Sequence, residues 1–137
     1  MGAVLATALL AAGCASPEQK LRDAAAQAGR EAASEVGTAR LAVEQLQAGQ
    51  LWAQPAGQVV GDAEKGVEQA ASSFAAQQPT SDEAQRLYDQ VTKALDDATQ
   101  AVTSVRIALG NGDLDRAGRQ LAGLRVAADQ LRRIGEL

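Results

Sequence analysis

At 137 residues, with 46% hydrophobic and 22% charged side chains, the chain has the length and composition of one globular domain, not of a disordered tail. Its formal charge of -4 argues against a nucleic-acid partner, because nucleic-acid binding relies on clustered Lys and Arg. The absence of histidine excludes Ser-His-Asp and Cys-His triads, the Glu-x-x-His di-iron motif of helical bundles, and His-ligated zinc or haem.

Alanine dominates the hydrophobic residues, with about thirty copies against one Trp, one Tyr and one Phe. Each buried Ala removes one methyl group from water, which is worth about 0.8 kcal/mol. The core therefore has to bring backbones close together, while Leu, Val and Ile supply its bulk.

The first element along the chain is a short apolar run over residues 3–12, which ends in Gly13-Cys14. It is far shorter than the roughly 20 residues that a helix needs to span a bilayer. We therefore interpret residues 1–13 as a signal peptide with a short hydrophobic region. A start codon upstream of Met1 would supply the basic residue that signal peptides carry before this region.

The segment Ala11-Ala12-Gly13-Cys14, with Leu10 just upstream, resembles the lipobox of bacterial lipoprotein precursors, Leu-Ala/Ser-Gly/Ala-Cys. The resemblance implies that a diacylglycerol, with acyl chains such as palmitate, is attached to the Cys14 sulfur and that the chain is cleaved after Gly13. It also implies a location at the cell membrane, on the extracytoplasmic face. Residues 14–16 would be the lipidated N-terminus and a short linker. The alternative is that Cys14 is a small apolar residue near a disordered N-terminus.

Residues 17–137 are predicted to form a helical bundle, because apolar side chains recur every three or four residues. The predicted helices cover residues 17–48, 55–77, 81–109 and 114–134. Short loops between four amphipathic helices favour an all-α, antiparallel up-down-up-down four-helix bundle with a long first helix.

Four local signals set these boundaries. Ser16 is the expected N-cap of the first helix, with Pro17 at its first position. Thr80 to Glu83 is interpreted as a capping box, with Thr80 as N-cap and Glu83 bonding back to it. Gly110-Asn111-Gly112 is expected to end the third helix, and Asp113 to cap the fourth.

The topology places Pro79 and the C-terminus at the Cys14 end, and Trp52 and Asn111 at the distal end. Because the first helix is the longest, its first two or three turns, at about 5.4 Å each, are expected to project as a stalk. The turns Leu46-x-x-Gly49-x-Leu51 and Leu109-x-x-Gly112-x-Leu114 share one pattern, which indicates either a duplicated helical hairpin or chance similarity.

The second helix is expected to be the least stable, because Gly57, Gly61 and Gly66 each cost up to about 1 kcal/mol relative to Ala. One interpretation is close helix packing at Gly57-x-x-x-Gly61. The other is that this helix opens to admit a partner or a lipid.

Carboxylates are the remaining candidates for chemistry. They form the pairs Glu31 with Glu35, Glu64 with Glu68, and Asp96 with Asp97. Glutamates four residues apart share a helix face and could bind a hard cation or act as acid and base, but a solvated face is the simpler interpretation. Glu35 is the exception, because it competes with Val36 for the buried side of its helix. We therefore predict no catalytic, cofactor or metal site.

Trp52, Leu51 and Asn111 are the candidate partner-binding residues. A Trp in a loop more often folds back to plug the end of a bundle, and otherwise makes a good binding anchor. The resulting hypothesis is a membrane-anchored, non-enzymatic structural or adaptor module that contacts an envelope protein. The alternative is a carrier that holds an apolar small molecule or lipid between its helices.

Overall fold

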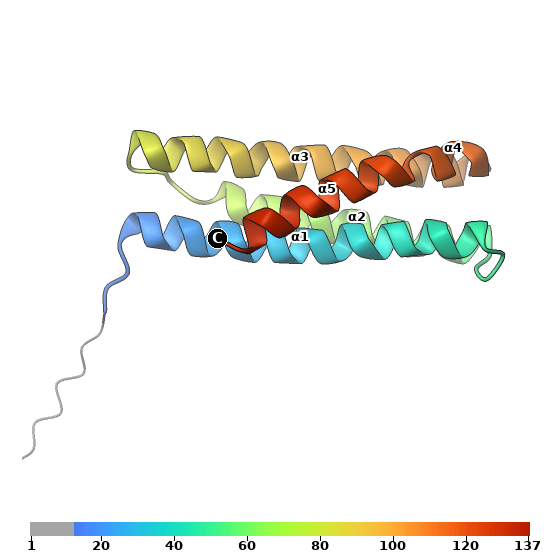
Figure 1. The fold of residues 1–137 in the computed structure, drawn as a ribbon, viewed down its shortest axis with the longest axis horizontal. Helices are drawn as coiled ribbons and strands as arrows, with labels where there is room; N and C mark the ends of the chain where they lie inside the picture. The colour runs from blue at the N-terminus through green and yellow to red at the C-terminus, as the bar shows by residue number, and fades with distance from the viewer. Residues whose placement is uncertain (1–12) are drawn as a thin grey trace, which may run out of the picture.

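The fold is described here from a computed structural model, which covers residues 13–137 (Figure 1). The apolar run of the predicted signal peptide lies outside the described residues. All regular structure in the described part is helical, and its bounds are α1 Pro17–Gln47, α2 Ala53–Ala75, α3 Asp82–Gly110, α4 Leu114–Arg119 and α5 Leu121–Gly135. The helices form an antiparallel four-helix bundle, in which α4 and α5 together take the fourth position (Figure 1). The predicted fold class is confirmed.

The four positions of the bundle are not packed equally. α1 contacts α2 and α5, and α3 contacts the same two helices, while α1 and α3 also approach each other across the core. Within residues 13–137, α2 and α5 do not come into contact. The buried face of α1 is mostly Ala, including Ala25, Ala28, Ala32 and Ala39. Small side chains let α1 and α3 approach closely, since interaxial distance depends on the side chains at the contact.

The core is apolar throughout: no polar or charged side chain is fully buried among the described residues. Its largest fully buried side chains are Phe74, Leu95, Leu124 and Leu131. The Phe74 ring stacks on the Tyr88 ring with centroids 5.3 Å apart, and the Tyr88 hydroxyl donates to the Ala75 carbonyl at 3.2 Å. This contact closes the α2–α3 end of the core and fixes where α2 stops.

The structure confirms the predicted N-caps Ser16 and Asp113 and corrects the other two helix starts. Asp113 Oδ1 accepts a hydrogen bond from Arg116 N at 3.0 Å before α4. Ser16 Oγ accepts a hydrogen bond from Gln19 N at 3.1 Å, as an N-cap does. At α3 the N-cap is Ser81, whose Oγ accepts from Ala84 N at 3.1 Å, so the predicted capping box starting at Thr80 is wrong. α2 begins at Ala53, before the predicted residue 55, because a proline in the first turn removes no intrahelical hydrogen bond.

The fourth predicted helix, 114–134, is broken at Gln120 into α4 and α5. The break lies between Gly118 and Gly123, and glycines are a common cause of sharp kinks. α4 packs against α3 and α1, and α5 then crosses the bundle obliquely to lie along α1 (Figure 1). The kink lets one segment of chain follow two differently directed grooves.

The two turns that share a sequence pattern also share a geometry. Gly49 and Gly112 both have positive φ, at 72° and 69°. Each glycine N–H donates to a leucine carbonyl at 3.1 Å, Leu46 in one turn and Leu109 in the other. The N–H of the residue after each glycine donates at 2.9 Å to a carbonyl in the last turn of the helix, Gln45 in one case and Ala108 in the other. These are Schellman motifs, in which glycine adopts the left-handed conformation at low cost.

The expected stalk is absent. Leu21 is buried in the core, and Glu18 Oε1 accepts a hydrogen bond from the Ser81 hydroxyl at 3.0 Å. The expectation was wrong because α3, with 29 residues, is nearly as long as α1, with 31, and packs beside its start.

Close glycine packing also occurs elsewhere than predicted. Gly57 has open space around the position of a Cβ, and a Cβ on Gly61 would only touch Arg106 at 3.9 Å. The closest approach of two helix backbones at a glycine is between α1 and the end of α5. A Cβ on Gly29 would lie 2.7 Å from Gly135 N and 2.8 Å from the Leu131 carbonyl oxygen. Two backbones meet at this point, so neither can yield as a side chain could.

We expect Gly29→Ala to destabilise the protein by about 1–3 kcal/mol in urea unfolding, because the added methyl group forces α5 away from α1. Gly37→Ala, in the same helix but with open space at the Cβ position, is the matched control. It should stabilise the protein by about 0.5–1 kcal/mol through helix propensity alone. Equal stability of the two variants would show that α5 is not packed on Gly29.

Candidate functional site

Cys14, the predicted lipid-attachment residue, is an exposed free thiol in the extended segment before α1. Only Ala15 and Ser16 separate it from Pro17, and Ser16 is held by its capping hydrogen bond. At about 3.5 Å per residue, a group on the Cys14 sulfur can lie only a short distance from the helix start.

The end of the bundle nearest to Cys14 consists of the starts of α1 and α3 and the α2–α3 turn, residues 76–81; we call it the proximal end (Figure 1). Arg22 of α1 pairs with Glu83 of α3 at 3.5 Å, next to the Glu18–Ser81 hydrogen bond. Glu83 therefore contacts another helix instead of bonding back to its own cap. These contacts join the first two turns of α1, which directly follow the segment that carries Cys14, to the start of α3.

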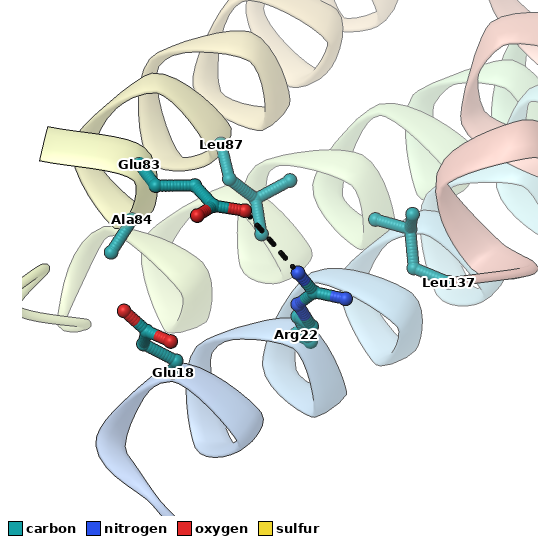
Figure 2. Close-up of a pocket in the computed structure, with 6 residues that line it drawn as sticks. All are labelled: Glu18, Arg22, Glu83, Ala84, Leu87 and Leu137. Carbon is teal, nitrogen blue, oxygen red and sulfur yellow. Dashed lines mark ion pairs between the residues drawn. The ribbon is translucent and has the colours of Figure 1, made fainter. Parts of the chain in front are cut away.

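A surface depression of about 180 Å³ lies beside these contacts (Figure 2). Its lining consists of Glu18, Arg22, Glu83, Ala84, Leu87 and Leu137. The last residue of the chain therefore reaches the proximal half of the molecule, as the predicted topology requires. The only cation in the lining of this depression, Arg22, is paired with Glu83. The lining holds no nucleophile beside a base.

The α1–α2 and α3–α4 turns lie together at the opposite end of the bundle (Figure 1). Trp52 is the N-cap residue of α2 and is 82% exposed, so the expectation that it plugs the bundle is wrong. Leu51, the preceding residue in the same turn, is the side chain that packs against the core. Asn111 is exposed and is the C-cap residue of α3. The structure thus brings the three candidate partner-binding residues to one end.

The paired carboxylates do not converge on a common site. Glu64 bonds to α3, whereas Glu68 is exposed. Glu31 accepts from Gln27 Nε2 at 2.9 Å. Glu35 is half-buried with its side chain over Gly66 of α2, which explains why this helix tolerates a glycine there. Among residues 13–137, no three His, Cys, Asp or Glu side chains are placed to hold a metal ion.

Asp96 and Asp97 likewise do not act as a pair, because their side chains have different surroundings. Asp97 forms an ion pair with Lys93, one turn earlier, at 2.7 Å, and Asp96 is exposed. Both belong to the outer face of α3, as expected for a solvated face.

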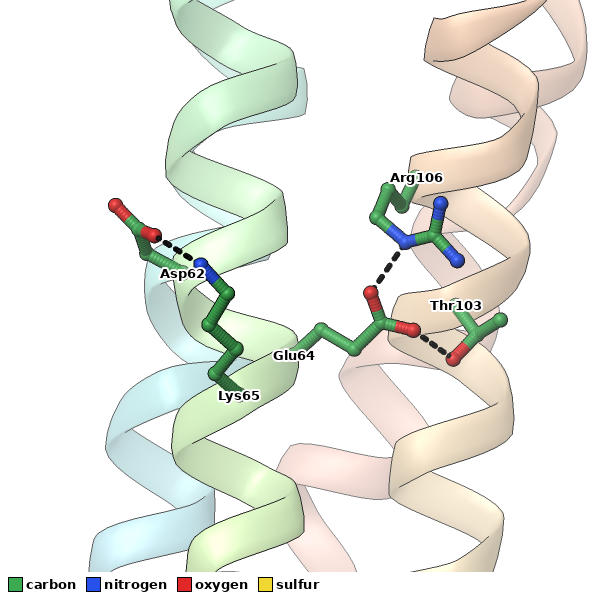
Figure 3. Close-up of polar contacts among 5 residues, drawn as sticks. All are labelled: Asp62, Glu64, Lys65, Thr103 and Arg106. Carbon is green, nitrogen blue, oxygen red and sulfur yellow. Dashed lines mark hydrogen bonds and ion pairs between the residues drawn. The ribbon is translucent and has the colours of Figure 1, made fainter.

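Glu64 carries the most specific polar contact between helices, which the sequence analysis did not identify. Its side chain is only 12% exposed, and its carboxylate accepts from the Thr103 hydroxyl and from Arg106 Nε on α3 (Figure 3). Burial by itself raises the pKa of Glu64, but the Thr103 and Arg106 hydrogen bonds and the Arg106 charge outweigh it and lower this pKa below its usual 4.5. The signal was hidden because the partners are about forty residues away in sequence.

Glu64→Gln should lower the free energy of unfolding by about 1 kcal/mol at neutral pH, because it removes the charge from both hydrogen bonds. Since the folded-state pKa is lowered, this stability is fully present above the unfolded pKa and is lost as pH falls through the folded value. Urea unfolding of both proteins should therefore converge at acidic pH.

Asp62→Asn is the control for this measurement. Asp62 lies one half-turn away on α2, and its ion pair with Lys65, at 3.4 Å, is exposed (Figure 3). Exposed pairs contribute roughly 0–1 kcal/mol, so this variant should unfold almost like the wild type. An equal loss in both variants would mean that general surface charge, and not the Glu64 contact, sets the pH dependence.

The helices in the described part of the chain are all too short or too polar to cross a membrane. Comparison with known proteins adds no relative: no family model, no curated protein and no solved structure matches this chain.

Proposed function

We propose that the protein is a bacterial lipoprotein, held at the extracytoplasmic face of the cell membrane by a lipid on Cys14. The observation that carries the proposal is the placement of Cys14. It is exposed, it directly follows an apolar run with small residues at its end, and it lies two residues before a capped helix. A signal peptidase and a lipid-transferring enzyme both need such an accessible segment ahead of the folded domain.

We further propose that the bundle is a non-catalytic structural or adaptor module. The proximal end would face the lipid, and the Arg22–Glu83 and Glu18–Ser81 contacts would keep the bundle in a fixed relation to its anchor. The opposite end presents Trp52 to solvent, where a Trp can serve as a binding anchor for an envelope partner. The non-catalytic role is supported by the absence of histidine from the chain and by carboxylate pairs that do not converge on a common site.

Mass spectrometry of the protein extracted from bacterial membranes tests the anchor. We expect a chain that begins at Cys14 and carries a mass increase from a diacylglycerol on that residue. Cys14→Ser should abolish the modification and release the protein from the membrane fraction, since this is the only cysteine. An unmodified Cys14 with the N-terminal residues still attached would refute the lipoprotein proposal.

The second candidate function is a carrier for an apolar molecule, and the packing of α2 favours it. Within the described residues 13–137, α2 contacts only α1 and α3. It also carries three glycines and has beside it a depression of about 230 Å³ that Leu95 and Ala71 line. Opening of α2 would enlarge this depression towards the apolar core.

Hydrogen exchange distinguishes the two functions. If α2 opens, its central amides should exchange at least about tenfold faster than those of α1 and α3, since three glycines weaken the helix by roughly 1 kcal/mol each. Protection in α2 equal to that in α1 would remove the route by which a carrier could take up its ligand.

A further inference from the structure

The end of the bundle opposite Cys14 combines one exposed aromatic ring with polar side chains that are uncharged except for Asp113, the N-cap of α4. We call it the distal tip and define it as residues 45–54 and 111–113. Trp52 is 82% exposed, more than any other large hydrophobic side chain in the described part of the chain. The preceding residue Leu51 packs against the core, whereas the indole lies in solvent and is free to contact something outside the bundle.

The chain around Trp52 is free of charge over an unusual length. Residues 45–61 hold no Asp, Glu, Lys or Arg, although 22% of the whole chain is charged. The same stretch contains Gln45, Gln47, Gln50, Gln54 and Gln58. The side chains of Gln50, Gln54 and Asn111 are exposed and form no hydrogen bond within residues 13–137. Each free amide can donate and accept, as a sugar hydroxyl also does.

We propose that the distal tip binds a neutral, hydroxyl-rich polysaccharide chain. This inference rests on the proposed adaptor function, in which the tip points away from the membrane. The apolar C–H face of a sugar ring would lie on the Trp52 indole. The hydroxyls around the ring would exchange hydrogen bonds with the amides of Gln50, Gln54 and Asn111.

The chemistry of the tip disfavours other ligands. Nucleic acids and anionic lipid headgroups need clustered cations, and residues 45–61 have none. A proline-rich peptide docks into a groove lined by several aromatic rings, whereas Trp52 is the only Trp and the Phe74–Tyr88 pair belongs to the proximal end. A single exposed ring, in a charge-free stretch of chain with exposed amides, suits a ligand that is both apolar on one face and polar at its edge.

The length of α1 sets how far from the membrane this contact would be made. With 31 residues at 1.5 Å each, α1 holds the tip roughly 45 Å from the Cys14 end. The ligand is therefore expected to be a polymer of the envelope at that height, and not a component of the membrane that carries the anchor.

Trp52 is also the probe for the test, because its fluorescence is the only Trp signal of the protein. The experiment uses the full chain with Cys14→Ser, so that no lipid is attached. It is titrated with oligosaccharides derived from chitin and from cellulose, with a proline-rich peptide, and with phosphatidylcholine vesicles. A saturable spectral change with one or both oligosaccharides, at up to millimolar concentration, is the expected result.

Co-sedimentation with insoluble chitin and cellulose extends the test to variants without Trp. Trp52→Ala should lower the apparent affinity about tenfold, which is typical for loss of a binding anchor. Because the Trp52 side chain is exposed, its removal should leave the fold intact, and circular dichroism checks this. Val126→Ala, which removes a 66% exposed side chain from α5, is the matched control and should bind like the wild type.

Three outcomes would overturn the proposal: no spectral change with either oligosaccharide, unchanged sedimentation of Trp52→Ala, or a response to the peptide or the vesicles alone. None of them bears on the lipid anchor, because these measurements use a chain without lipid. Conversely, an unmodified Cys14 in membranes would refute the anchor and leave the sugar titration standing.

Discussion

The close approach of helix backbones is the constraint on which this bundle depends. Alanine removes little surface from water when buried, so an alanine-rich core gains its stability from dense packing. The structure achieves this in two ways: α1 and α3 meet across the core, and Gly29 lets the end of α5 rest on the backbone of α1. The break at Gln120 makes the second contact possible, because it turns α5 from the groove beside α3 towards α1.

The polar contacts between helices then fix the direction and the register of this packing. Glu64 with Thr103 and Arg106 joins α2 to α3 near their middle, and Arg22 with Glu83 joins α1 to α3 at the proximal end. All of these side chains lie at the surface of the bundle, so none of their charges is placed in the apolar core. The apolar core therefore stabilises the bundle, and the polar surface contacts set the direction and register of its helices.

The proposed function follows from the contrast between the two ends. At the proximal end the exposed Cys14 precedes a helix start that is tied to α3, so an anchor there would orient the whole bundle. At the distal tip Leu51 packs against the core and Trp52 lies in solvent, and the exposed amides of the same tip form no hydrogen bond within residues 13–137. An elongated bundle with these two ends is suited to join a membrane to something at a distance from it.

The sequence by itself determined the all-α class, the four positions of the bundle and the turns between them. These depend on local interactions: a repeat of three to four residues, the cap at Ser16, and Schellman turns at Gly49 and Gly112 whose hydrogen bonds span only a few residues. The lipid attachment at Cys14 is likewise proposed from a local motif.

Only the tertiary structure decided which side chains meet across the bundle. Glu83 could bond to its own helix or to Arg22, and the position of α1 selects Arg22. Gly29, and not Gly57, meets another helix backbone, because α5 is kinked towards Gly29. The exposure of Trp52 was likewise decided by the tertiary structure, in which the neighbouring Leu51 packs against the core and Trp52 does not. Such outcomes depend on contacts between residues far apart in the chain, which periodicity and capping signals do not encode.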